Sequence, residues 1–333
     1  MTLEEIKGKY PSLLQNTIDY LKHPEIAEAL NDEDFDAVFK RLTDSAIPIM
    51  AFLLKEIGID PLQSLTYIPD RYFEALDLQH VVLGPNIQTI TGNSFSRAHI
   101  QHIDLSKTKI EKLPYMAFEL CRDLISIQLP ETLTIIDNCA FNNCSGLISI
   151  VIPDSVTNIG FEVFLNCSSL KEITIGRGVV SIGAGAFTGC YSVEVLNYNA
   201  NVTSVYDSPF SNLGKRAERT VVNINSTIVP ANLFHGCSDI DEVNMGNNIT
   251  TIGDSAFSWC TGLKSIEIPS SVTYIGEEAF ECCYGLTSAM IFGTETTIEP
   301  NAFQRCNDLQ YVYSKTPDLG IIYLPYKCKI VYI

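Results

Sequence analysis

Apolar and polar residues follow one pattern along most of this chain, and the pattern returns about every 23 residues. Phenylalanine marks the register most clearly. The interval between successive Phe residues is 23, except for 24 between the sixth and the seventh, and Phe73 precedes the series by 22 as a degenerate first unit. The series comprises Phe95, Phe118, Phe141, Phe164, Phe187, Phe210, Phe234, Phe257, Phe280 and Phe303. Such regularity predicts a repeat architecture.

The residues around each Phe follow A-F-x-x-C-x-x-L-x-x-I-x-I-P-x-x-V-x-x-I-G, with the clearest copies at 140–160 and 256–276. The alternation in L-x-x-I-x-I predicts a half-buried strand, which the proline ends because it lacks an amide donor. V-x-x-I predicts a second short extended stretch. We expect the glycine after it to take a positive φ, and A-F-x-x-C to form a helical or 3₁₀ turn that directs Phe inward.

One such unit cannot bury both of its faces, so successive units must stack. Strands of successive coils then pair in parallel about 4.8 Å apart, and ten coils extend roughly 50 Å. The fold class predicted is an α/β repeat: a right-handed solenoid of about ten to eleven coils with a parallel sheet face, spanning residues 67–313.

The A-F-x-x-C, I-x-I-P and V-x-x-I-G elements resemble the BspA-like leucine-rich repeat family over about residues 73–313. The resemblance implies a leucine-rich repeat solenoid. Members of that family include bacterial surface adhesins, protist proteins and proteins of large phages. The adhesins carry export signals, whereas the start of this chain, MTLEEIKGKYPSLL, lacks the basic and apolar regions of a secretory signal.

Both ends of the chain depart from the repeat. Residues 1–66 carry apolar positions at helical spacing and predict a small helical domain. It is either a cap over the first coil or a separate binding or oligomerisation module. The apolar segment 314–333 is expected to pair with the last coil and close it, or to form a homodimer contact.

The coil after Phe210 is irregular, because it contains the one-residue insertion and GKRAERT where an apolar strand should begin. It carries the only tight basic cluster, formed by Lys215, Arg216 and Arg219. One interpretation is a drifted coil with a solvated loop, and the other is a contact loop.

Side chains alternate along a strand, so the residues flanking the first Ile of I-x-I point outward in two parallel columns. Counting by the repeat puts Arg219 in the first column and Val221 in the second. Met and aromatic residues on an outward face are typical of interface hot spots. The partner-binding residues predicted from the columns are His80, His102, Asp104, Gln128, Glu172, Asn197, Glu242, Asn244, Glu267, Met290, Tyr311 and Tyr313. For Tyr311 and Tyr313, packing under the C-terminal segment is the alternative.

The formal net charge of −17 argues against direct nucleic-acid binding and against anionic membranes, because both need excess Lys and Arg. Residues 230–303 hold ten acids and one base, Lys264, which leaves nine negative charges. A protein partner with a basic surface is therefore favoured. No apolar stretch approaches the roughly 20 residues of a membrane helix. These features, with the thiols below, predict a cytoplasmic protein.

No residues with catalytic spacing stand out. Eight cysteines lie three residues after a repeat Phe, which predicts a buried ladder of reduced thiols and not a zinc site: Cys121, Cys144, Cys167, Cys190, Cys237, Cys260, Cys283 and Cys306. His80 and His102 stack near Asp104, which fits an ordinary polar face or a site for a metal or anion. The chain has no phosphate loop or nucleophile motif, and we expect no enzyme activity, cofactor or metal.

The function predicted is a non-enzymatic protein-binding scaffold, an adaptor or inhibitor, that uses the outward sheet face. Two other functions stay open. The acids of 230–303 fit an acidic mimic of nucleic acid that blocks a DNA- or RNA-binding partner, and the family resemblance leaves a surface adhesin. The oligomeric state is undetermined, with a dimer through residues 1–66 or 314–333 as the option.

Overall fold

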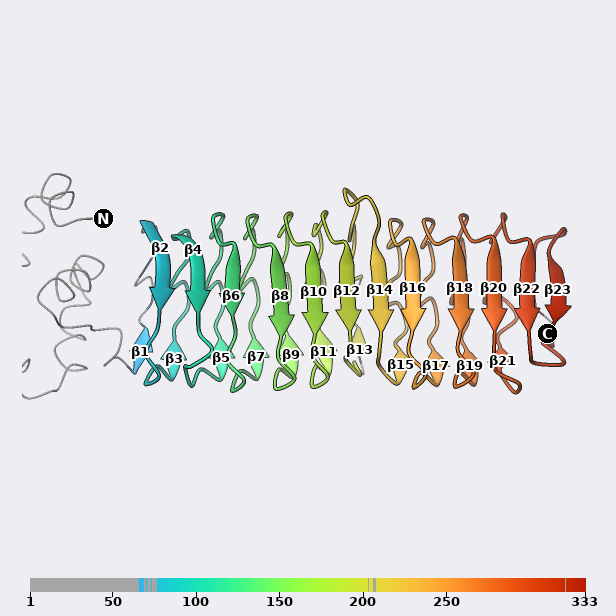
Figure 1. The fold of residues 1–333 in the computed structure, drawn as a ribbon, viewed down its shortest axis with the longest axis horizontal. Coiled ribbons are helices and arrows are strands. Elements are labelled where there is room, and N and C mark those ends of the chain that lie inside the picture. The colour runs from blue at the N-terminus through green and yellow to red at the C-terminus, as the bar shows by residue number, and fades with distance from the viewer. Residues whose placement is uncertain are drawn as a thin grey trace, which may run out of the picture.

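A computed structural model describes residues 66–68, 70, 73, 77–202, 204–205, 208–320 and 322–333. In this part the chain winds into a parallel-sheet solenoid of about ten turns (Figure 1). The predicted helical domain over 1–66 lies outside the described residues, apart from Thr66. Each coil contains one longer strand and one short strand, as the L-x-x-I-x-I and V-x-x-I segments predicted.

The longer strands stand in one row along the molecule (Figure 1). Each pairs in parallel with strands of neighbouring coils, and together they form the long sheet face. They are β2 (Asp77–Val82), β4 (His99–Asp104), β6 (Ser126–Gln128), β8 (Ser149–Ile152), β10 (Glu172–Ile175), β12 (Val195–Tyr198), β14 (Val221–Ile224), β16 (Glu242–Met245), β18 (Ser265–Ile268), β20 (Ser288–Ile291), β22 (Tyr311–Ser314) and β23 (Lys329–Tyr332).

The short strands form a second parallel series and point in the opposite direction (Figure 1). They are β1 (Tyr67–Ile68), β3 (Thr89–Ile90), β5 (Lys112–Leu113), β7 (Ile135–Ile136), β9 (Asn158–Ile159), β11 (Ser181–Ile182), β13 (Ser204–Val205), β15 (Ile228–Val229), β17 (Thr251–Ile252), β19 (Tyr274–Ile275) and β21 (Thr297–Ile298).

The repeat Phe residues form a continuous buried spine. Neighbouring rings from Phe73 to Phe303 stack with centroids 4.7–5.4 Å apart, and each ring is at most 3% exposed. The A-F-x-x-C segment that places them is a tight turn and not a helix, and the described residues contain no helix. The α component of the predicted class is therefore wrong for this part of the chain. The second residue after each Phe from Phe95 to Phe303 takes a positive φ, which tightens the corner.

The glycines after V-x-x-I do not take a positive φ, so that expectation is wrong. They are required by the spacing between coils. A Cβ on Gly183 would lie 2.6 Å from the backbone carbon of Gly160 in the preceding coil, and one on Gly253 would lie 2.6 Å from the amide nitrogen of Ala231. A side chain at these corners would push neighbouring coils apart.

The last strand, β23, pairs in parallel with β22, so the C-terminal segment adds a strand to the sheet. Leu319, Ile322 and Leu324 of this segment pack on the core, but β23 itself does not bury its apolar residues. Ile330 is 39% exposed and Tyr332 is 57% exposed, although their partners in β22, Val312 and Ser314, are fully buried. β23 has no strand on its other side among the described residues.

Candidate functional site

The long sheet face carries all of the predicted partner-binding residues in its strands, in two columns. In the central coils the first column runs through Glu172, Val195, Val221 and Glu242, one residue per paired strand. The second column contains Thr174, Asn197, Asn223 and Asn244. The predicted register was wrong for β14, because Val221 belongs to the first column and Arg219 precedes the strand.

An insertion and a later shortening of the chain, which nearly cancel in length, cause this register error. Eleven residues separate Phe210 from Val221, where eight separate Phe187 from Val195. The segment between Val221 and Phe234 is shorter than its equivalent in the preceding coil and offsets most of this insertion. The interval between the two Phe residues therefore grows only from 23 to 24. The extra residues form the loop that projects between β12 and β14 (Figure 1).

That loop contains the basic cluster, and two of its members are engaged within the molecule. The Arg216 guanidinium lies 4.7 Å from the centre of the Tyr191 ring, and the Arg219 guanidinium forms an ion pair with the Glu242 carboxylate. Arg219 therefore neutralises part of the acidic character predicted for Glu242.

The N-terminal part of the face uses its polar groups locally. His102 Nδ1 lies 2.8 Å from Ser126 Oγ, and Asp104 Oδ1 accepts a hydrogen bond of 2.8 Å from the Ser106 amide. Gln128 is exposed on β6. The side chain of His80 lies outside the described part of the structure. Among the described residues, no group of three His, Cys, Asp or Glu side chains could hold a metal ion.

Asparagine side chains form a hydrogen-bonded ladder across the middle of the face. Asn244 Nδ2 donates to Asn223 Oδ1 at 3.0 Å, and Asn223 Nδ2 donates to Asn197 Oδ1 at 2.9 Å. Asn197 Nδ2 in turn donates to Thr174 Oγ1 at 3.2 Å and to Glu172 Oε1 at 3.4 Å. The predicted residue set omitted Asn223 because of the register error. Its signal in the sequence is V-N-I, which repeats the apolar-Asn-apolar pattern of neighbouring coils.

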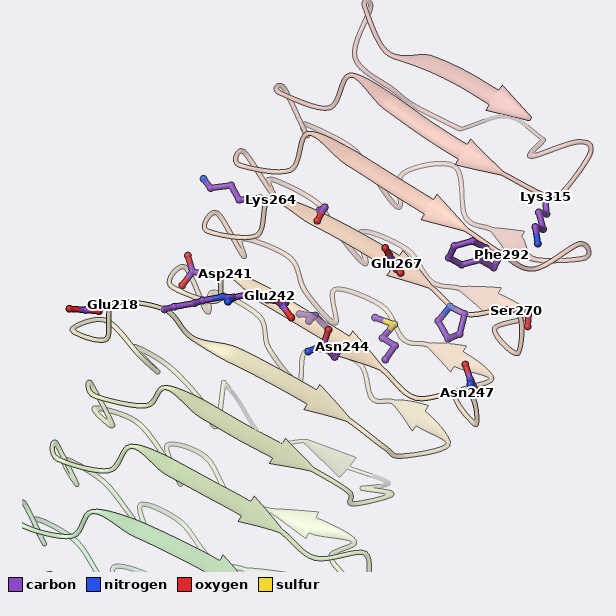
Figure 2. A pocket seen from close by; sticks show the side chains of 15 residues that line it. Glu218, Asp241, Glu242, Asn244, Asn247, Lys264, Glu267, Ser270, Phe292 and Lys315 are labelled. Carbon is purple, nitrogen blue, oxygen red and sulfur yellow. Dashed lines mark hydrogen bonds and ion pairs between the residues drawn. The ribbon is translucent and has the colours of Figure 1, made fainter. Parts of the chain in front are cut away.

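The long ladder is interrupted between β16 and β18, which belong to different sheets. A groove of about 900 Å³ opens on the face at this point (Figure 2). Glu242, Asn244 and Glu267 lie on the two strands, and Phe292 and Lys315 come from later coils. The structure thus brings three of the predicted residues together around one depression. We call it the β16–β18 groove.

The β16–β18 groove carries opposite charges and an apolar end. Lys315 Nζ lies 5.5 Å from the centre of the Phe292 ring, and Met245 and Pro269 also line the groove. The basic side chains are Arg219, Lys264 and Lys315, and the acidic ones are Glu218, Asp241, Glu242 and Glu267. Asp241 accepts a hydrogen bond from the Thr220 amide at 2.8 Å. No interaction within the described residues is seen for the Glu267 carboxylate, which is exposed.

The remaining predicted residues lie beyond the groove. The rings of Tyr311 and Tyr313 stack with centroids 5.8 Å apart, and Met290 pairs with Tyr313 across β20 and β22. β23 continues the sheet beside these rings, with Lys329 next to Tyr311. Because it lies beside them, Tyr311 stays 37% exposed. Packing under the C-terminal segment is therefore wrong for Tyr311, whereas Tyr313 is half-buried.

The acids of residues 230–303 do not share one face. Of the ten, only Glu242 and Glu267 lie in long strands. Glu277, Glu278 and Glu281 belong to the turn after β19, and Glu299 follows β21. A nucleic-acid mimic needs regularly spaced carboxylates on one surface, and the long sheet face presents only these two acids of the segment.

The thiols lie on the inner side of the turn, next to the Phe spine. Each ladder Sγ donates to the carbonyl of the repeat Phe in the preceding coil, from 2.9 Å for Cys121 to 3.4 Å for Cys190 and Cys237. Burial raises the pKa of the Cys121 thiol to about 12 and raises the pKa values of Cys144, Cys167, Cys190, Cys237 and Cys260 as well. Such thiols are poor nucleophiles. The hydrogen bonds between coils are a role that sequence reasoning did not find.

Comparison with known proteins gives a family match over most of the chain. The BspA type Leucine rich repeat region (6 copies) matches residues 51–145, 106–216 and 227–322. Comparison with curated proteins gave no significant match. Within the described residues, no helix is long and apolar enough to cross a membrane.

Several solved structures are similar. A leucine-rich repeat protein from Bacteroides ovatus ATCC 8483 is 26% identical, with 81% of this chain and 76% of that chain covered and a TM-score of 0.57. The T. pallidum Leucine Rich Repeat protein is 24% identical, with 59% and 82% covered and a TM-score of 0.42. A leucine rich cell surface protein from Faecalibacterium prausnitzii A2-165 is 21% identical, with 74% and 82% covered and a TM-score of 0.35. The first of these agrees with the solenoid fold.

Proposed function

Because this chain belongs to the BspA-type leucine-rich repeat family, we propose that it is a non-enzymatic scaffold, an adaptor or inhibitor, that binds a protein partner on the long sheet face. The observation that carries this proposal is the β16–β18 groove, which combines a depression, exposed carboxylates and an apolar end. Small polar residues cover much of the rest of the face.

The partner has a basic surface at the point of contact. Glu267 is exposed and unpaired within the described residues, and the whole chain carries a net charge of −17. A field of this sign attracts a basic partner and raises its association rate. Met290, Tyr311 and Tyr313, which lie farther along the same face, supply the apolar contacts that slow dissociation.

The test begins with capture of the partner from the source cell on the intact protein, followed by surface-binding kinetics. The double variant Glu242→Lys with Glu267→Lys should slow association, and the loss should shrink at high salt because screening removes long-range attraction. The double variant Tyr311→Ala with Tyr313→Ala should mainly speed dissociation.

The matched control is Glu277→Lys with Glu295→Lys. It makes the same change in net charge within the same half of the chain, at exposed positions outside the long strands. Equal effects of the two charge-reversed pairs would show that net charge acts without a site on this face. Association that is unchanged by both pairs, with binding lost when residues 1–66 are altered, would move the binding site to the N-terminal segment.

A further inference from the structure

The asparagine ladder has a direction. From Asn244 through Asn223 to Asn197, each Nδ2 donates to the oxygen of the side chain in the preceding coil, and the last donor reaches Thr174. Each amide therefore uses its oxygen to accept from the following coil and its nitrogen to donate to the preceding one. Hydrogen bonds aligned in this way polarise one another. Asn244 Oδ1, the oxygen at the end of the ladder, therefore becomes a stronger acceptor.

The end of the ladder lies at the β16–β18 groove. Asn244 is its last member, and the position 23 residues later is Glu267 (Figure 2). An asparagine there would donate to Asn244 Oδ1, but an ionised glutamate has only acceptors. Asn244 Oδ1 and the Glu267 carboxylate are thus two acceptors on neighbouring strands, and neither accepts a hydrogen bond from the described residues. The sheet is interrupted at this same junction.

Resting on the function proposed above, we propose that the β16–β18 groove receives the guanidinium of an arginine in the partner, between Asn244 Oδ1 and the Glu267 carboxylate. A guanidinium offers several N–H donors in a planar fork and fits a carboxylate in bidentate geometry. Its charge meets the unpaired Glu267, and its N–H groups supply the donors that the ladder lacks.

Two further features favour arginine over lysine. The same groove already holds a guanidinium–carboxylate pair, Arg219 with Glu242, and Glu242 lies two residues before Asn244 on β16. The apolar end of the groove, with Met245, Pro269 and Phe292, can pack against the alkyl stem of an arginine, whose head is more weakly hydrated than an ammonium.

The experiment is a titration of the full isotope-labelled chain with N-acetyl-arginine amide, followed by NMR at the side-chain amides of Asn244, Asn223 and Asn197. Shifts should be largest at Asn244 and diminish along the ladder. N-acetyl-lysine amide should bind less tightly, and N-acetyl-citrulline amide, which keeps the shape but lacks the charge, should bind about tenfold more weakly or not at all. Equal binding of the citrulline compound would overturn the proposal, and equal binding of the lysine compound would overturn the assignment to guanidinium.

Glu267→Gln tests the position. Glutamine removes the charge and can itself donate to Asn244 Oδ1, so arginine binding should weaken about tenfold or more. Glu277→Gln is the matched control, because it removes the same charge at an exposed position outside the long strands and the asparagine ladder, and it should leave binding at Asn244 unchanged. Equal affinity of Glu267→Gln and the unmodified chain contradicts the assignment.

The outcome separates this inference from the proposed function. If arginine amide leaves the three asparagine signals unmoved while the captured partner still depends on Glu242 and Glu267, the inference is wrong and the binding face stands. If partner binding is also indifferent to those residues, both are wrong.

Discussion

At the scale of single residues, the Phe spine is the main source of packing between coils. Phe164 is fully buried between Phe141 and Phe187, with ring centroids 5.1 Å away on both sides. Truncation leaves a cavity that two rigid neighbouring coils cannot close. We expect Phe164→Ala to lower the free energy of unfolding by about 3–5 kcal/mol in urea denaturation.

Phe161 is the control for this substitution, because it lies three residues away in the same coil and is 50% exposed. Phe161→Ala should change stability by less than about 1 kcal/mol. An equal loss in both variants would mean that aromatic content, and not the buried stack, stabilises the coil.

The ladder thiols make stability depend on alkaline pH. Unfolded thiols ionise near pH 8.5. Burial raises their pKa in the folded protein, to about 12 for Cys121, so the native state keeps protons that the unfolded state loses. Their contribution is fully present below the unfolded pKa and is lost as pH rises toward the folded pKa. Stability should therefore fall between about pH 9 and 12, by about 1.4 kcal/mol per pH unit for each such thiol.

Cys167→Ala tests this dependence, since it removes one buried thiol whose pKa is raised by burial. Above pH 9, the slope of the unfolding free energy against pH should become shallower by the contribution of one thiol, about 1.4 kcal/mol per pH unit. Ser168→Ala, at the next residue, should leave the slope unchanged. An unchanged slope in Cys167→Ala would show that other groups control alkaline unfolding.

At the scale of elements, the two parallel ladders are interrupted at different coils. The long ladder stops between β6 and β8 and between β16 and β18, and the short ladder stops between β3 and β5 and between β13 and β15. At each interruption the other ladder continues. Every junction from β2 to β22 is therefore held by at least one set of backbone hydrogen bonds, and the β16–β18 groove opens where only the short strands pair.

This arrangement predicts uneven hydrogen exchange. Amides of β18 that face β16 lack a partner strand, whereas those of β12 are paired with β10 and β14. Mass-spectrometric exchange should show faster uptake in peptides covering β16 and β18 than in those covering β10 and β12, because opening there breaks fewer bonds. Equal protection of β16 and β18 and of β10 and β12 would mean that β16 and β18 form backbone hydrogen bonds with each other in solution.

At the scale of the whole molecule, charge is unbalanced, with 39 acids against 22 bases. The described residues form few ion pairs, and each of these has at least one exposed member, such as Lys171 with Glu194. Self-repulsion of a net charge of −17 destabilises the compact state, and salt screens it. We expect the melting temperature to rise as NaCl increases from about 0.01 to 0.15 M, over which the Debye length falls from about 30 to 8 Å.

A charge-reduced variant provides the control for salt. Replacing the exposed Glu277 and Glu295 by Gln lowers the net negative charge by two. The salt-dependent increase in melting temperature should then be smaller than in the unmodified chain. A melting temperature that falls with added salt would indicate that attractive ion pairs outweigh the repulsion.

The sequence by itself determined the repeat, the core and the strand positions outside β14. A Phe every 23 residues and alternating Ile positions require one inward face, and only stacking buries it, so the solenoid, the Phe spine and the thiol ladder could all be predicted. The same pattern could not predict the backbone conformation of the glycine that follows V-x-x-I. Glycine after V-x-x-I suggested a positive φ, but Gly183 is required by the backbone of the preceding coil, a contact between residues distant in sequence.

Only the tertiary structure decided the register at β14 and the position of the groove. The insertion after Phe210 is almost compensated before Phe234, so the repeat count misplaced Val221 and missed Asn223, whereas the hydrogen bonds between strands fix both. The interruption between β16 and β18 likewise leaves no mark in the repeat, because it depends on how whole coils stack. The residues of the proposed binding face could thus be predicted as a list, but the position of Glu242, Asn244 and Glu267 around one groove arises from contacts between coils.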